Sequence, residues 1–286
     1  MTKAPELSGA RREPAAADRG HGPGAVAGRL LRGNAAAGVL GFAGFLALLE
    51  VVPRLGVVSP DYLPPFSRIV GALGDLLVED EFWGAVGDTM RSWAVGLLIA
   101  VTAGIVTGFV IGTVPVLREF TASTIEFLRP IPSVALIPLA VLAFGLSMKS
   151  TLLLVVYASF WQVLIQVLYG VADVDPVARD TARSFGLGRW ARTVHVTWPT
   201  ALPYVFTGVR LAAAVALILA ITAELVIGIP GLGLQIGTAQ QSGAVPRMYA
   251  LVVVTGVIGV TVNVGFRALE RRLLSWHSSV RSEVPV

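Results

Sequence analysis

The chain alternates long apolar runs with short polar connections, and the runs are close to the length of a membrane-spanning helix. A helix that crosses the hydrocarbon core of a bilayer needs roughly 20 apolar residues. Six runs come near this length: 35–52, 93–117, 130–148, 150–172, 199–227 and 248–266. Barrel strands would alternate apolar and polar positions instead of forming such continuous runs. We therefore predict an all-α membrane protein with six transmembrane helices.

The polar ends and one long connection differ in character from the spans. Residues 1–34 are rich in Ala, Gly, Pro and charge and show no apolar periodicity, so we expect a disordered N-terminal tail. Residues 35–274 form the predicted membrane domain, and residues 275–286 a second tail. Segment 59–88 carries six acidic residues and an apolar stripe, which predicts a short amphipathic helix at the outer membrane surface. It would either cap the bundle or contact another protein.

The composition narrows the functional classes. Hydrophobic residues make up 55% of the chain and charged residues 14%, more apolar than a water-soluble core could bury. There is no cysteine, and the three histidines, His21, His195 and His277, lie in the tails and a loop, so we expect no metal site and no cofactor. The basic residues are scattered between apolar runs without interleaved aromatics, which argues against nucleic-acid binding.

The distribution of Lys and Arg predicts the orientation in the membrane. The tails and the even-numbered connections together hold fifteen of the 22 basic residues, whereas the other connections hold four. Cytoplasmic connections carry the excess of basic residues in membrane proteins. We therefore place both termini in the cytoplasm.

Ionisable residues inside the spans are costly unless they are paired or functional. Six qualify: Glu50, Arg91, Glu126, Arg129, Arg210 and Glu224. Arg210 and Glu224 share the fifth span and point roughly the same way, but they stand about 21 Å apart along the helix axis. We name Arg129, Arg210 and Glu224 as candidates for a substrate pathway, with pairing inside the bundle as the alternative.

Glycine and proline in the second and third spans predict special packing. The second span has a small residue at every fourth position: Gly96, Ala100, Gly104, Gly108 and Gly112. Such a ribbon suits tight helix contact, either within the chain or with a second copy. In the third span, Pro130, Pro132 and Pro138 predict a broken or kinked helix. Broken helices often border transport pathways.

The connection 173–198 carries the strongest local signals for helices outside the spans. Asp175 can cap a helix that Pro176 begins, and Gly186 is placed to end it. Helical spacing puts one set of residues on a common face: Val177, Ala178, Thr181, Ala182 and Phe185. A second short helix over 189–198 would run into Pro199 and the fifth span.

The same connection resembles the EAA loop of ABC importer permeases. It contains Asp180-Thr181-Ala182, then three residues, Gly186, nine residues, and Val196-Thr197-Trp198-Pro199, which matches the family spacing throughout. Four identities depart from the family pattern: Asp180, Thr181, Val196 and Trp198. Further motifs extend the resemblance over about residues 63–274, including Phe127-Leu128-Arg129-Pro130-Ile131-Pro132 and Gly231-Leu232-Gly233. Together they resemble the nitrate, sulfonate and taurine branch of these permeases.

The resemblance implies a type I importer fold in the bacterial inner membrane, with a cytoplasmic coupling helix-turn-helix between the fourth and fifth spans. It also implies four kinds of partner: two cytoplasmic ATPase subunits, a second permease copy or paralogue, an external solute-binding protein, and the lipid bilayer. The solute would be a small anion such as a sulfonate, taurine, nitrate or a carboxylate. The implied ATPase-coupling residues are Val177, Asp180, Thr181, Ala182, Phe185, Gly186 and Pro199.

ATP would be bound by the partner subunits, because the chain has no Gly-x-x-x-x-Gly-Lys-Ser/Thr loop to hold a phosphate. We therefore expect a transport subunit that is not itself an enzyme. A transporter driven by an ion gradient is the alternative, supported by the isolated carboxylates Glu50, Glu126 and Glu224. A membrane enzyme is disfavoured, since no paired carboxylates, histidine cluster or Ser/His/Asp set converges in the spans.

Overall fold

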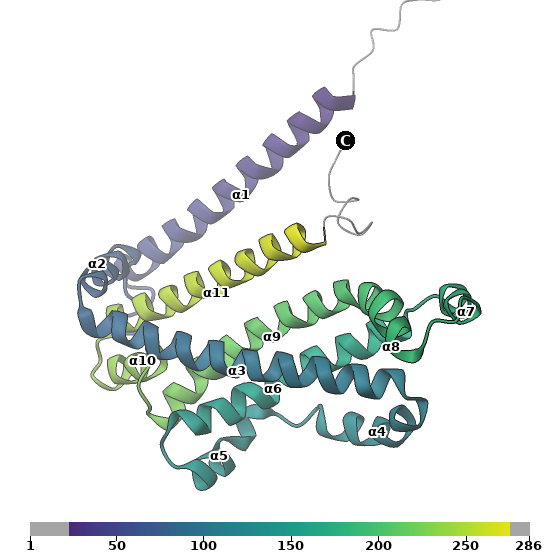
Figure 1. The fold of residues 1–286 in the computed structure, drawn as a ribbon. Helices are drawn as coiled ribbons and strands as arrows, with labels where there is room; N and C mark the ends of the chain where they lie inside the picture. Colours follow the sequence, from purple (N-terminus) through teal and green to yellow (C-terminus); the bar gives the residue numbers. More distant parts are fainter. Residues whose placement is uncertain (1–22, 275–286) are drawn as a thin grey trace, which may run out of the picture.

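A computed structural model describes the backbone of residues 23–274 and the side chains of residues 37–274, and every regular element in that range is a helix (Figure 1). Five helices are long and apolar enough to cross a membrane, and one bent pair passes the same test when its two parts are taken together, which gives up to six spans. The single helices are α1 (Pro23–Arg54), α3 (Asp80–Thr113), α6 (Met148–Ala172), α9 (Trp198–Ile227) and α11 (Val245–Leu273). The predicted six-span, all-helical fold is confirmed.

The third span is the bent pair, and its bounds differ from the predicted run 130–148. It consists of α4 (Pro115–Leu128), a 3-10 turn (Ser133–Leu136) and α5 (Ile137–Phe144), with an 83° bend. The second span likewise ends at Thr113, before Pro115 starts α4, and not at 117 as predicted. The hydropathy of 93–148 is nearly continuous, so only the prolines could have indicated where the chain turns.

The break after α4 follows from missing backbone donors. The carbonyl of Leu128 would normally accept a hydrogen bond from the amide four residues later, but that residue is Pro132, which has no N–H. The hydroxyl of Tyr157 on α6 donates to this carbonyl instead, at 2.7 Å, and the Ile131 amide donates to it at 3.2 Å. The predicted interruption of the third span is thereby confirmed.

Helices α3, α6 and α9 form the centre of the bundle (Figure 1). The glycine ribbon of α3 faces a row of valines on α6. A Cβ atom added at Gly96 would lie 2.5 Å from Val155 Cγ1, and one at Gly108 would lie 2.6 Å from Val167 Cγ1. Because only glycine permits this approach, the close contact predicted for the ribbon exists within one chain.

The two ends of the bundle carry different short helices (Figure 1). At one end, called the cap end here, α2 (Phe66–Leu77) and α10 (Leu232–Gln241) pack with the first turns of α3 and α11. At the other, the loop end, lie α7 (Pro176–Ser184) and α8 (Arg189–Arg192). Helix α2 buries Ile69 and Leu76 and exposes its polar face, so the amphipathic helix predicted in segment 59–88 is confirmed.

Helices α1 and α11 both lead away from the cap end, toward the side of the molecule where α7 lies (Figure 1). Helix α1 begins at Pro23, ahead of the start predicted at residue 35. Residues 1–22 and 275–286, which make up most of the two predicted tails, lie outside the described residues.

Candidate functional site

The loop between α6 and α9 is built from the local signals that its sequence contains. The amide of Val177 donates to Asp175 Oδ1 at 2.8 Å, and Pro176 occupies the first turn of α7. Gly186 has a left-handed backbone with φ of +75°, and the amide of Leu187 closes the helix end by donating to Ala182 O at 3.0 Å. Start and end of α7 therefore lie where Asp175, Pro176 and Gly186 predicted them.

Most of the predicted coupling face of α7 is free surface. Ala182 is buried against the rest of the chain, whereas Val177 is 70% exposed and Phe185 80% exposed. Asp180 and Thr181 are also exposed. Trp190 of α8, which was not among the predicted residues, is 80% exposed. A tryptophan between Arg189 and Arg192 in a polar loop was the signal for it.

The base of this loop is fixed to the bundle. A Cβ atom at Gly170 of α6 would lie 2.9 Å from Ala201 Cα of α9, so the two helices touch where the loop leaves them. The hydroxyl of Tyr204 donates to Asp173 Oδ2 at 2.9 Å, and Val174 is buried. The base of the loop is therefore held against both α6 and α9.

Helix α8 passes into α9 without a turn. The segment between them, Thr193–Thr197, is a π-helix, and α9 begins at Trp198 with Pro199 in its first turn. The predicted second helix over 189–198 is thus present as the first part of one helical run, Arg189–Ile227.

The three predicted pathway residues lie in different environments. Arg129 is exposed at the end of α4. Arg210 is partly buried and pairs with Glu270 of α11, with 3.1 Å between Nη1 and Oε2. Three alanines spaced four residues apart between Arg210 and Glu224, Ala212, Ala216 and Ala220, are buried in the core of the chain. Glu270 lies beyond the predicted end of the sixth span and was missed for that reason.

Glu224 is fully buried at the cap end of α9. Its Oε2 atom accepts a hydrogen bond from Thr89 Oγ1 of α3 at 2.8 Å and another from the Gly233 amide at 3.1 Å. The Thr89 hydroxyl accepts in turn from the Leu232 amide at 2.9 Å. Within the described part of the chain, Glu224 Oε1 has no hydrogen-bond partner. The carboxyl group thus joins α3, α9 and the start of α10.

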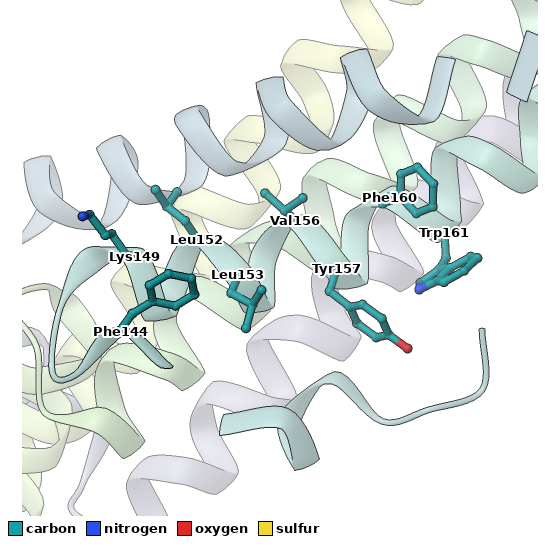
Figure 2. A pocket seen from close by; sticks show the side chains of 8 residues that line it. All are labelled: Phe144, Lys149, Leu152, Leu153, Val156, Tyr157, Phe160 and Trp161. Atoms are coloured by element: carbon teal, nitrogen blue, oxygen red, sulfur yellow. The ribbon is translucent and has the colours of Figure 1, made fainter. Parts of the chain in front are cut away.

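A hollow of about 440 Å³ lies along α6 beside the end of α5 (Figure 2). It is lined by Phe144, Lys149, Leu152, Leu153, Val156, Tyr157, Phe160 and Trp161. Figure 2 shows Lys149 at one end and Trp161 toward the other. The walls are mostly apolar side chains. Among residues 37–274, no three His, Asp or Glu side chains converge as ligands for a metal ion.

Six apolar spans, one of them broken at prolines, and a helical loop that projects from α6 and α9 define a multi-pass membrane protein. The family described as "Binding-protein-dependent transport system inner membrane component" matches residues 82–275, and the chain belongs to this family. It is 31% identical over 241 residues to the taurine transport system permease protein TauC of Escherichia coli (strain K12), covering 82% of this chain and 88% of that protein.

Other relatives carry related names. The putative aliphatic sulfonates transport permease protein SsuC of Bacillus subtilis (strain 168) is 30% identical, covering 82% of this chain and 85% of that protein. The nitrate import permease protein NrtB of Leptolyngbya laminosa is 27% identical, covering 70% of this chain and 76% of that protein. The family resemblance predicted from the loop spacing is confirmed.

Solved structures share the fold. A bacterial ABC transporter involved in the import of the acidic polysaccharide alginate has a chain that matches with a TM-score of 0.59 and 15% identity, over 85% of this chain and 99% of that one. An inward-facing form of the MetNI methionine ABC transporter matches with a TM-score of 0.57 and 14% identity, over 66% of this chain and 94% of that one. The type I importer fold predicted from the resemblance is confirmed.

Proposed function

We propose that this protein is the translocation subunit of an ATP-driven importer, and that α7 and α8 bind a separate ATPase subunit. The complete importer would contain two cytoplasmic ATPase subunits, a second permease copy or a paralogue, and an external solute-binding protein. The partner subunits bind and hydrolyse ATP, so this chain carries no catalytic residue and no cofactor of its own.

One observation carries the proposal: large apolar side chains are exposed on a helical loop whose base is fixed. Burying a side chain such as Val, Phe or Trp is worth roughly 1.5–3 kcal/mol, and clusters left exposed mark contact surfaces. Val177, Phe185 and Trp190 are each at least 70% exposed on the loop that contains the left-handed Gly186. Since α6 and α9 hold the base of the loop, a partner that moves α7 moves both spans as a lever.

The proposed orientation places the loop end in the cytoplasm. The loop carries four arginines: Arg179, Arg183, Arg189 and Arg192. The cap end instead carries exposed acidic residues, among them Asp61, Asp75 and Asp80. This asymmetry follows the excess of basic residues on the cytoplasmic side. Since α1 and α11 lead from the cap end toward the side of α7, both termini would lie in the cytoplasm.

The proposed solute is a small anion. The named relatives transport taurine, aliphatic sulfonates and nitrate, all compact anions or zwitterions. Arg129 and Arg210 offer positive charge in the third and fifth spans, and we keep them, with Glu224, as proposed pathway residues. Arg129 suits this role best, since its side chain is exposed.

Co-purification tests the proposal. The tagged chain is extracted from membranes in mild detergent, and bound proteins are identified by mass spectrometry for wild type, Phe185→Ala and Tyr62→Ala. Phe185 and Tyr62 are aromatic residues with similar exposure, 80% and 77%, and they lie at opposite ends of the bundle. Tyr62→Ala is therefore the matched control for Phe185→Ala. We expect an ATPase subunit with wild type and Tyr62→Ala, and its loss from Phe185→Ala.

Absence of any ATPase from wild type, or its equal recovery with Phe185→Ala, would contradict the assigned role of the loop. Transport that persists without ATP but collapses with the ion gradient would instead favour the gradient-driven alternative. The buried carboxyl of Glu224 is the observation that supports that second candidate.

A further inference from the structure

Helix α9 connects the two ends of the bundle. Its 30 residues span about 45 Å at the usual helical rise. It continues from α8 at the loop end and reaches Glu224 and Gly228 at the cap end. After α9, the chain turns into α10, which is bracketed by Gly228 and Gly243, both with left-handed backbone. The contacts between α10 and α9 therefore determine whether the cap end moves together with α9.

The approach of α10 to α9 is too close for side chains. A Cβ atom added at Gly233 would lie 2.2 Å from the carbonyl oxygen of Ile221, and one at Gly231 would lie 2.2 Å from the Glu224 carboxyl carbon. The first turn of α10 thus lies directly on the backbone of α9 and on the Glu224 side chain.

The amides at the start of α10 are satisfied by other helices. The first amides of a helix have no partner within it, and an oxygen-bearing side chain just before the helix usually supplies one. Here the preceding residue is Gly231, which has no side chain to do so. Thr89 of α3 accepts from the Leu232 amide, and Glu224 of α9 accepts from the Gly233 amide.

We propose that Glu224 is a positioning residue that, together with Thr89, caps α10 from outside and so fastens the cap end to α9 and α3. A leucine of similar size would be cheaper to bury than a carboxyl group whose second oxygen has no hydrogen-bond partner among the described residues. It could not accept from the amide of Gly233. If the proposed function holds, α10 would move together with α9 when the ATPase moves the loop, because Glu224 and Thr89 hold the two helices together.

The absence of cysteine from the chain allows a direct test with single-cysteine variants. Ala239 on the inner face of α10 is 3% exposed, whereas Gln241 on the same helix is exposed. The full chain, in nanodiscs, carries either Ala239→Cys or Gln241→Cys and is labelled with a membrane-impermeant maleimide. Ala239 packs in the cap-end cluster with residues of α2, α3 and α11, so the rate of labelling at residue 239 reports how often α10 leaves this cluster.

Glu224→Leu and Thr89→Val should each raise the labelling rate at residue 239 about tenfold, because each removes buried hydrogen bonds at the start of α10. Glu224→Gln and Thr89→Ser keep an acceptor or a hydroxyl and should stay within about twofold of wild type. Ser159→Ala is the control, since it removes a buried hydroxyl that donates to Ala212 O in the bundle centre. Labelling of Gln241→Cys should not change.

Unchanged labelling at residue 239 in both Glu224→Leu and Thr89→Val would overturn the proposal. A similar rise in Ser159→Ala, or failure of Thr89→Ser to retain protection, would also overturn it, since a general loosening of the fold would then explain the result. Because the assay needs no ATPase, its outcome is independent of whether α7 and α8 bind one.

Discussion

Arg247 donates two parallel hydrogen bonds to Glu79, with 2.7 Å from Nη1 to Oε1 and 2.6 Å from Nη2 to Oε2. This two-point geometry is the strongest form of a charge-assisted hydrogen bond. The pair joins the residue before α3 to the first turn of α11, across 168 residues of sequence. It therefore closes the cap end of the bundle.

The stability contributed by this pair should depend on pH. The hydrogen bonds from Arg247 hold the pKa of Glu79 below its ordinary value of 4.5. A lowered folded-state pKa means that the contribution is complete above 4.5 and fades as the pH falls through the lowered pKa. In detergent, the unfolding temperature of Glu79→Gln should be lower than that of wild type at pH 7. The difference between the two temperatures should shrink at about pH 4. Equal loss in the exposed neighbour Glu81→Gln would contradict this.

The glycine ribbon of α3 should tolerate no added methyl group. Gly108→Ala should destabilise the protein by roughly 1–3 kcal/mol, because its Cβ would overlap Val167 of α6. Gly87 lies on the same helix with nothing within 4 Å, so Gly87→Ala should be neutral or slightly stabilising. Thermal unfolding in detergent compares the two. Val167→Ala should restore part of the loss in Gly108→Ala, and no restoration would mean that the overlap is not the cause.

Loss of the α7 cap should loosen the loop end. Asp175→Ala should cost about 1 kcal/mol of helix stability, because the Val177 amide loses its acceptor. A loss of about 1 kcal/mol corresponds to about a fivefold rise in the population of molecules in which α7 is unfolded. Trypsin cleavage after Arg179, inside α7, should accelerate by this factor in detergent. Asp175→Ser, which keeps a capping oxygen, should cleave at the wild-type rate, and rapid cleavage of this variant would rule out the cap as the cause.

The pairing of Arg210 with Glu270 separates structure from transport. Arg210→Met should lower stability by up to about 3 kcal/mol, because Glu270 would be left partly buried without its partner. The double variant Arg210→Met/Glu270→Met should regain that stability. If Arg210 also attracts an anion, uptake of the transported solute should stay low in the stable double variant. Full uptake there would limit Arg210 to its structural pairing.

Signals that act on the backbone were informative without any knowledge of the fold. Asp175, Pro176 and Gly186 predicted both ends of α7, because a cap, a fixed φ angle and a left-handed turn act within a few residues. Pro130 and Pro132 predicted the break after α4 for the same reason. Helical periodicity did not predict the exposed Trp190, because α8 is too short to indicate which face meets solvent, and only the neighbouring Arg189 and Arg192 pointed to it.

By itself the sequence determined the helical class, the number of spans, the helical loop and its family pattern. These properties depend on hydropathy, residue spacing and local backbone chemistry. Only the tertiary structure decided which groups meet: Gly108 with Val167, Arg210 with Glu270, and Glu224 with Thr89 across 135 residues. Such contacts depend on which helices are neighbours and how each is rotated about its axis, and hydropathy along one chain contains neither quantity.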